Sequence, residues 1–337
     1  MAGELVKAEE QRAQVAQLGQ DVREYIAQAK AGNTRRAYRS DWQHFAAWCE
    51  GQGVCPLPAA PETVAAYLAA HAKEQPAPLA DALEGQRTRP ALSVGTLQRR
   101  LVSIGQAHQA AGQDDPTKAP GVRATWQGIR RVKGVAPKGK AAAIAQDVIR
   151  MVGALPEGTL GVRDRALLLV GFAGAFRRSE LVGIDRGDVA FTLEGAVITL
   201  RRSKTDQEGE GRKVGIPRGR HAETCPVRAL TAWLERAGIT EGPVFRPVNR
   251  HGQVLAGRLS GNAVAQVVKR SAQAAGLDPS DYAGHSLRAG LATSAAAAGV
   301  SERAIMAQTG HRSTTMVRRY IRDGALFREN AAAAVGL

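Results

Sequence analysis

The sequence has little cysteine and no long apolar run. Its three cysteines, Cys49, Cys55 and Cys225, have neither the spacing nor the neighbours of a zinc site or a disulfide framework, which favours a reducing compartment. The longest apolar run, from Ala166 to Phe176, is too short to cross a bilayer, and the N-terminus is polar and unlike a signal peptide. We therefore expect a cytoplasmic protein with no metal, no disulfide and no membrane partner.

Acidic residues are also scarce, with 31 Asp and Glu against 46 Lys and Arg, a formal net charge of +15 and a pI near 10.3. Such a field attracts a polyanion, because each phosphate that is neutralised releases counterions. The simpler interpretation is a merely basic surface, but the basic residues recur in clusters along the chain and not in one tail. We predict nucleic acid as the partner, with candidate DNA contacts at Arg35, Arg36, Arg39, Arg99, Arg100, Arg130, Arg131, Lys133, Lys138, Lys140 and Arg202.

The length of 337 residues favours two domains. We predict an N-terminal arm with a weak helical pattern over residues 1–32, followed by an all-helical module over residues 33–133. Helices of this module are predicted to start near Asn33, Pro61 and Ser93, since each of these residue types is favoured at a helix N-terminus.

A linker is predicted over residues 134–141, where Gly, Pro and Lys occur without apolar periodicity. Gly134, Gly139 and Lys140 match the glycine and lysine positions of a nucleotide-binding loop. Ala141 stands where magnesium coordination needs Ser or Thr, and no strand precedes the loop, so we attribute the match to chance.

The C-terminal domain, residues 142–337, is predicted to be mostly helical with a small antiparallel sheet. Residues 197–200 and 213–216 have the pattern of short strands. The polar turn between them, residues 202–212, places Lys204 near a hairpin tip, where a flexible ammonium can reach a ligand. The fold class is therefore mainly α, with an all-helical N-terminal domain and an α+β C-terminal domain that is mostly helical.

A nucleophile, two imidazoles and a guanidinium lie close together near the C-terminus. Tyr320 follows His311 by nine residues (320 − 311 = 9), and His285 and Arg288 lie just upstream. A phenol, with a reference pKa of about 10, attacks well only where cations receive the developing charge. Arginine and histidine around a tyrosine hydroxyl are suited to hold a phosphate while the tyrosine attacks it. The pattern predicts phosphoryl transfer to tyrosine.

Taken singly, these residues have simpler explanations. A histidine is more often packed or on the surface than catalytic, and a lysine in a turn or an arginine on a helix is often only solvated. Arg202 and Lys213 compete with Lys204 for the role of the hairpin cation, and Arg178 competes with Arg177. The cluster as a whole favours a site.

Four blocks of this sequence resemble the tyrosine recombinases, the family of phage integrases, chromosome dimer resolvases and Cre. The blocks are Ala175-Phe-Arg177-Arg178-Ser-Glu180-Leu, Lys204 in the hairpin turn, His285-Ser-Leu-Arg288, and Gly310-His311 followed by Tyr320. The N-terminal module is similar to the core-binding domain of Cre around residues 42–49 and 61–68. His311 stands where Cre has Trp, although His is the commoner residue in the wider family.

The resemblance implies a role for each residue. Tyr320 attacks the phosphate and forms a 3′-phosphotyrosyl link, Lys204 protonates the departing 5′ oxygen, and His285 assists proton movement as acid or base. The groups that hold the phosphate are Arg177, Arg288 and His311, and Glu180 orients the neighbouring cations. No cofactor is implied.

The resemblance further implies a specific site of inverted repeats in double-stranded DNA, a free monomer, and four protomers that exchange strands through a four-way junction. An apolar helical stretch in the tail, residues 325–337, docks on a neighbouring protomer or on its own domain. Two alternatives stay open: a type IB topoisomerase, disfavoured by the Cre-like N-terminal helices, and a non-catalytic DNA-binding regulator, disfavoured because all six candidate catalytic positions are present. The DNA sequence, the direction of the reaction and its biological role are not determined by the chain.

Overall fold

The computed structural model describes residues 32–76, 88–135, 139–201 and 211–324. The chain divides into two compact units, unit 1 (Met1–Lys138) and unit 2 (Gly139–Leu337). The predicted arm up to residue 31, Lys138, Arg202, Lys204 and the tail 325–337 lie outside the described residues.

The division falls within residues 134–141, where the sequence predicts a linker. The last residues of this stretch bond to unit 2. The backbone N–H of Ala141 donates to the carbonyl of Asp281 at 2.8 Å, and Lys140 Nζ donates to the carbonyl of Ser280 at 2.6 Å.

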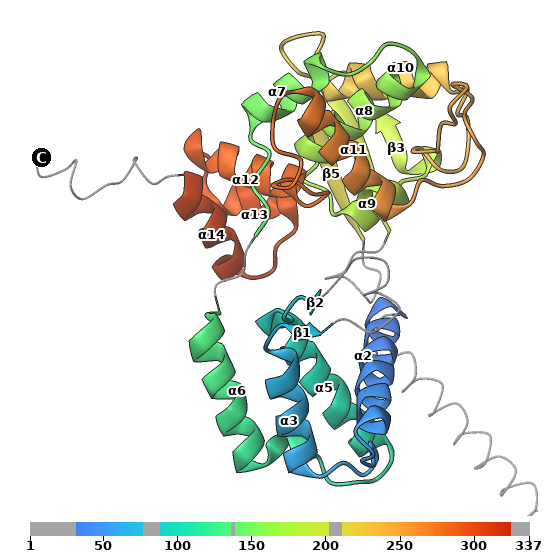
Figure 1. Ribbon diagram of the computed structural model, residues 1–337. Coiled ribbons are helices and arrows are strands. Elements are labelled where there is room, and N and C mark those ends of the chain that lie inside the picture. Colours follow the sequence, from blue (N-terminus) through green and yellow to red (C-terminus); the bar gives the residue numbers. More distant parts are fainter. Residues whose placement is uncertain (1–31, 77–87, 136–138, 202–210, 325–337) are drawn as a thin grey trace, which may run out of the picture. The chain divides into compact units, whose positions relative to one another are not determined.

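Helices make up most of the described part of unit 1 (Figure 1). In chain order they are α2 (Gly32–Gly51), α3 (Pro61–His71), α5 (Val94–Ala110) and α6 (Pro120–Lys133), with the short 3-10 helix η1 (Pro116–Lys118) before α6. Two short strands, β1 (Gln75–Pro76) and β2 (Thr88–Arg89), pair antiparallel. This small pair is an addition to the helices that the sequence predicts.

The helix starts follow local chemistry. Pro61 is the first residue of α3, where its missing N–H leaves no bond unmade. Ser93 caps α5, because its Oγ accepts the N–H of Thr96 at 3.1 Å. The first described helix begins at Gly32, so Asn33 lies inside its first turn, where its side chain accepts a hydrogen bond from Arg36 at 2.7 Å.

The core of unit 1 combines aromatic and aliphatic side chains. The rings of Phe45 and Tyr67 meet edge to face, with centroids 5.1 Å apart. Leu97 and Ile104 of α5 pack in the same cluster and are wholly buried. A period of three to four residues therefore turns one face of each helix inward, as the sequence predicts.

Arg100, which the sequence predicts as a DNA contact, is buried in the structure. Its side chain is 10% exposed, and its Nη1 donates to Tyr67 Oη at 2.8 Å and to His44 Nδ1 at 3.0 Å. Its Nε lies 3.7 Å from Asp41 Oδ1. Burial, and then the charge of Arg100, lowers the pKa of His44 to about 4, so His44 is neutral and can accept this bond. Arg100 is thus a core cation and is not available to a phosphate.

Unit 2 contains a small sheet among helices (Figure 1). Its antiparallel strands are β3 (Val189–Phe191), β4 (Gly195–Leu200) and β5 (Arg212–Pro217), in the order β3-β4-β5. The two strands predicted from the sequence are confirmed as β4 and β5. Strand β3 was not predicted, because it has only three residues and two of them are exposed.

The helices of unit 2 follow the predicted patterns. They are α7 (Ala145–Gly153), α8 (Thr159–Ala173), α9 (Arg178–Gly183), α10 (Pro226–Arg236), α11 (Gly261–Ala274), α12 (Ser286–Ala297), α13 (Glu302–Thr309) and α14 (Thr314–Gly324), with the 3-10 helix η2 (Arg186–Asp188) before β3. The apolar run that is too short for a membrane supplies most of the central helix α8, whose Leu167, Leu168 and Val170 are wholly buried. It packs against α10 and α12.

A smaller apolar cluster joins α12, α13 and α14. Ala292, Ala296, Ile305 and Val317 form it, and the ring of Tyr320 packs at its edge. These contacts fix the three helices relative to one another. The fold class predicted from the sequence, mainly α with a small antiparallel sheet, is confirmed.

Candidate active site

The structure places five of the six predicted catalytic residues, all in unit 2, and the sixth, Lys204, lies outside the described residues. Two pairs of side chains are in direct contact. His285 Nε2 lies 3.0 Å from Tyr320 Oη, and Arg288 Nη2 lies 3.1 Å from His311 Nε2. The rings of His311 and Tyr320 have centroids 6.1 Å apart. Segments that are distant in the sequence therefore meet in one cluster.

Arg177 enters this cluster from the N-terminus of α9. Its backbone N–H donates to Glu180 Oε2 at 2.9 Å, and its Nη1 donates to Glu180 Oε1 at 2.5 Å. The carboxylate of Glu180 is 1% exposed, whereas the guanidinium of Arg177 is 17% exposed. Glu180 thus bonds to both the backbone and the side chain of Arg177.

Arg288 is the buried cation of the site, with no exposed surface. Its Nη1 donates to the carbonyl of Ala175 at 2.8 Å. Ala175 lies between α8 and α9 with a φ of 49°, in the left-handed region that is unfavourable for a residue with a Cβ. This turn points the carbonyl at Arg288 and leads directly into Arg177.

Burial of cations next to one another has an energetic cost at this site. Burial first, and then the charge of Arg177, lowers the pKa of Arg288 to about 10. Arg288 stays charged near neutral pH, and its Nε has no hydrogen-bond partner among the residues that the structure describes. A buried cation that repels its neighbours is stabilised when an anion binds beside it. The site is therefore prepared for a negatively charged group.

Tyr320 lies on α14 and is half-buried. The 3.0 Å contact with His285 places an imidazole within reach of the phenolic proton. His285 immediately precedes α12 and lies one helical turn before Arg288, so both side chains come from the start of the same helix. His285 and Arg288 are thus placed by one element.

His311 follows Gly310, which ends α13 in the left-handed conformation with a φ of 65°. Its Nδ1 lies 2.7 Å from the hydroxyl of Thr309, and its Nε2 receives the bond from Arg288. Burial first, and then the charge of Arg288, lowers the pKa of His311 to about 4. The ring is therefore neutral at physiological pH in this conformation.

Arg212 is a third guanidinium that the sequence analysis missed. Its Nη1 donates to the carbonyl of Gln308 at 3.2 Å, and its Nη2 lies 3.9 Å from Glu180 Oε2. It also lies so close to Gly310 that a Cβ there would be 2.8 Å from Arg212 Nε. Burial, as the largest cause, lowers the pKa of Arg212. Arg212 therefore connects the first residue of β5 to both Glu180 and the stretch that carries His311.

The alternation of buried and exposed residues along β5 could have identified Arg212 as a residue of the inner face. Side chains alternate along this strand, so that Arg212 lies on the inner face with Val214 and Ile216, whereas Lys213 is exposed. Lys213, one of the alternatives to Lys204 as the cation of the hairpin, thus points away from the site.

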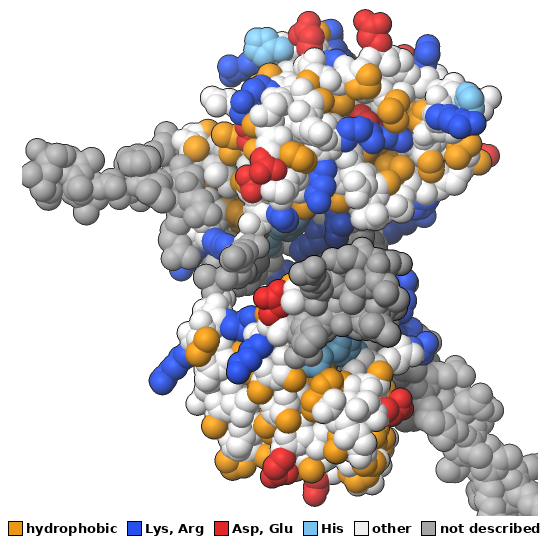
Figure 2. Space-filling view, viewed as in Figure 1, with side chains coloured by type: hydrophobic (Ala, Val, Ile, Leu, Met, Phe, Trp, Pro, Cys, Tyr) orange, Lys and Arg blue, Asp and Glu red, His pale blue; other side chains and the backbone are white. Residues whose placement is uncertain are grey.

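The predicted DNA contacts within the described residues are exposed, with the exception of Arg100. They lie on α2 (Arg35, Arg36, Arg39), α5 (Arg99), α6 (Arg130, Arg131, Lys133) and the segment before α7 (Lys140). Arg99 Nε bonds to Asp41 at 2.6 Å, and Lys133 Nζ bonds to the carbonyl of Ala72 at 2.9 Å. Figure 2 shows Lys and Arg side chains spread over the visible face of unit 2.

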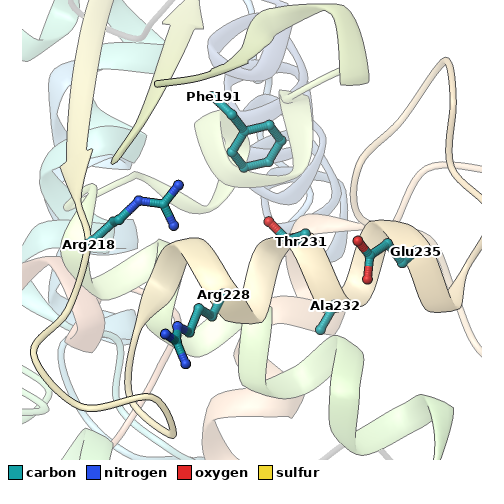
Figure 3. A pocket seen from close by; sticks show the side chains of 6 residues that line it. All are labelled: Phe191, Arg218, Arg228, Thr231, Ala232 and Glu235. Carbon is teal, nitrogen blue, oxygen red and sulfur yellow. The ribbon is translucent and has the colours of Figure 1, made fainter. Parts of the chain in front are cut away.

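A hollow of about 420 Å³ elsewhere on unit 2 contains none of the predicted catalytic residues (Figure 3). Phe191 and Arg218 lie across from α10, which supplies Arg228, Thr231, Ala232 and Glu235. Among the described residues, no group of three or more His, Cys, Asp and Glu side chains could hold a metal ion. No helix in this part of the chain is both long and apolar enough to cross a membrane.

Comparison with known proteins gives consistent relatives. The model of the phage integrase family matches residues 144–325. An integrase/recombinase xerD homolog of Selenomonas ruminantium is 42% identical over 310 residues, which cover 91% of this chain and 86% of that protein. Recombinase cre of Escherichia phage P1 is 24% identical over 315 residues, 88% of this chain and 85% of that protein.

Solved structures share the fold. A lambda integrase dimer bound to a COC′ core site is similar with a TM-score of 0.57 and 18% identity, over 93% of this chain and 96% of that one. A lambda integrase tetramer bound to a Holliday junction is similar with a TM-score of 0.57 and 17% identity, over 92% of this chain and 78% of that one.

Proposed function

Because this chain belongs to the phage integrase family and is a tyrosine recombinase, we propose that it cleaves and rejoins DNA through a covalent link between Tyr320 and a 3′ phosphate. The observation that carries the proposal is the 3.0 Å contact between Tyr320 Oη and His285 Nε2, made beside the buried cation Arg288. It combines a nucleophile, a proton acceptor and an anion site in one place.

The proposed cleavage is an in-line displacement at phosphorus. Arg177 and Arg288 bind the non-bridging oxygens and stabilise the negative charge that accumulates on them. Tyr320 Oη bonds to phosphorus, its proton passes to His285, and the bond from phosphorus to the 5′ oxygen breaks. Lys204, which follows β4 and precedes β5 in the sequence, supplies the proton that this oxygen takes as it leaves.

Rejoining reverses these steps. A 5′ hydroxyl from another strand attacks the phosphotyrosine, and the tyrosine leaves with a proton. One phosphoester is exchanged for another, so the reaction needs neither ATP nor a cofactor. When the attacking strand comes from a second duplex, the product is a four-way junction.

We place this chemistry on a specific DNA site with inverted repeats, bound by two protomers, and in a synapse of four. The 42% identity to a xerD homolog and the lambda integrase tetramer on a Holliday junction support this assembly by analogy. The exposed arginines of α2 and α6 are proposed to contact the DNA backbone, since guanidinium groups match phosphate oxygens. Binding should therefore weaken steeply with salt.

Covalent trapping tests the proposal. The full chain is incubated with a library of nicked duplexes, in which the short cleaved fragment diffuses away and prevents rejoining, and protein-linked DNA is sequenced to recover the site. We expect a covalent adduct with the wild type and none with Tyr320→Phe, which should still bind the recovered site. Relaxation of supercoiled DNA by the monomer without strand exchange would instead support a topoisomerase.

A further inference from the structure

A chain of hydrogen bonds passes through His311 and ends in the helix before it. Arg288 Nη2 lies 3.1 Å from His311 Nε2, and His311 Nδ1 lies 2.7 Å from Thr309 Oγ1. Thr309 Oγ1 in turn lies 2.7 Å from the carbonyl oxygen of Ile305. The Thr309 side chain is wholly buried, whereas His311 is partly exposed.

The two ends of this chain determine where its hydrogens lie. A guanidinium only donates and a carbonyl only accepts, so His311 Nε2 must accept from Arg288, and the Thr309 hydroxyl must donate to Ile305. The neutral ring then carries its hydrogen on Nδ1 and donates it to Thr309 Oγ1. In this state Nε2 has a lone pair and cannot donate to a phosphate oxygen.

The proposed function requires the opposite tautomer, because His311 is expected to donate a hydrogen bond to the scissile phosphate. We propose that Thr309 is a positioning residue whose hydroxyl rotates between Ile305 and His311 and so permits either tautomer of the His311 ring. This inference rests on the proposed function of the same site.

The change of tautomer moves one proton onto the His311 ring and one off it. When a phosphate binds the hydrogens of Arg288, His311 Nε2 loses its donor. Nε2 then takes a proton from water while Nδ1 returns one to water, and the ring remains neutral. The hydroxyl of Thr309 turns from the Ile305 carbonyl to Nδ1, which is now an acceptor. Within a helix the same carbonyl also accepts the N–H four residues later, so Ile305 is not left unpaired.

Two substitutions at this position separate the hydroxyl from the packing. Thr309→Val keeps the shape of the side chain and removes the donor and acceptor, whereas Thr309→Ser keeps the hydroxyl. Both variants are compared with the wild type for thermal unfolding, so that a packing defect is recognised by a lowered midpoint.

The first readout needs no DNA. In protein labelled with ¹⁵N-histidine, the ring nitrogen shifts distinguish the two tautomers, and the spectrum of His311→Gln identifies the His311 signals. We expect the Nδ1–H tautomer in the wild type and in Thr309→Ser, and a shift of population toward Nε2–H in Thr309→Val. An Nε2–H or doubly protonated ring in the wild type at pH 7, or an unchanged ring in Thr309→Val, overturns the proposal.

The second readout is the rate of covalent adduct formation on the recovered site. We expect Thr309→Val to react about tenfold more slowly, because with the phosphate bound it cannot make the hydrogen bond from the Thr309 hydroxyl to His311 Nδ1. Thr309→Ser keeps the hydroxyl and should stay close to the wild type. In a His311→Gln background the Thr309→Val change should add little, since Thr309 acts through His311. Equal slowing in both backgrounds assigns Thr309 a merely structural role and overturns the inference. If the wild type forms no adduct on any DNA, the proposed function fails while the tautomer result still stands.

Discussion

Replacing Glu180 with Gln tests whether one buried carboxylate holds the cations of the site in place. Glu180 is 1% exposed and accepts hydrogen bonds from Arg177, at 2.9 Å from the backbone nitrogen and 2.5 Å from Nη1. Arg212 Nη2 lies 3.9 Å from Glu180 Oε2, the oxygen that accepts the Arg177 backbone N–H. The amide keeps the shape of the side chain, but it removes the charge and turns one acceptor into a donor that faces guanidinium groups.

The expected loss is large for a single substitution. Removing the charge of one partner in a buried ion pair costs about 3 to 5 kcal/mol of stability, because the charge of the other partner is left without compensation. The free energy of unfolding of a domain is only about 5 to 15 kcal/mol. With a urea dependence of about 2 kcal/mol per molar, the midpoint of unit 2 should fall by about 1.5 to 2.5 M.

The measurement is hydrogen exchange at increasing urea, followed by mass spectrometry of peptides from α8. The buried amides of α8 exchange only when unit 2 opens, so unfolding of unit 1 does not disturb the result. Glu235→Gln is the matched control, because Glu235 is exposed on α10 and its change should stay within about 0.5 kcal/mol. A loss below about 1 kcal/mol for Glu180→Gln would refute the view that this carboxylate holds the cations.

Three further predictions concern the cations and protons of the site. Arg212→Met should slow adduct formation about tenfold, because a charged hydrogen bond is lost. It should also raise the pKa of His311 in NMR titration, because Arg212 is one of the cations that lower this pKa. Lys213 is exposed on the same strand, so Lys213→Met should change neither the rate nor the pKa. His311 has a pKa of about 4 in the folded chain, against 6.5 for a solvated histidine side chain, so its contribution to stability is present above pH 6.5 and is lost as the pH falls toward 4. Unfolding measured across this range should therefore show a smaller decline for His311→Gln, and equal slopes contradict the burial argument. Lys204→Ala should slow cleavage strongly, but much less on a substrate with sulfur as the bridging 5′ atom, since a thiolate leaves without a proton; equal slowing on both substrates excludes Lys204 as the acid.

The sequence predicted the gathering of the site because the residues lie in short blocks at fixed spacings. Arg288 is the third residue after His285, about one helical turn further on, and this places both at the start of α12. The strands β4 and β5 were predicted for a similar reason, since their apolar alternation is local. The positions of side chains that depend on which face of a helix or strand turns inward were harder to predict.

Arg100 and Arg212 illustrate that difficulty. Arg100 lies between Leu97 and Leu101 on the buried stripe of α5, a position that the helical period already indicates, but its cluster with Arg99 favoured a surface role. Arg212 lies at the end of a strand where the polar turn masks the alternation of β5. The bond from Thr309 to His311 depends on the left-handed turn at Gly310; the glycine indicates that the helix ends there, but not which side chains the turn brings together.

The central claim is that Tyr320 bonds to phosphorus. The most direct measurement is mass spectrometry of the trapped adduct after digestion of both the protein and the DNA. The account predicts one peptide, from α14, that carries a 3′-linked nucleotide on Tyr320. A nucleotide on any other residue, or a 5′ linkage, would contradict it.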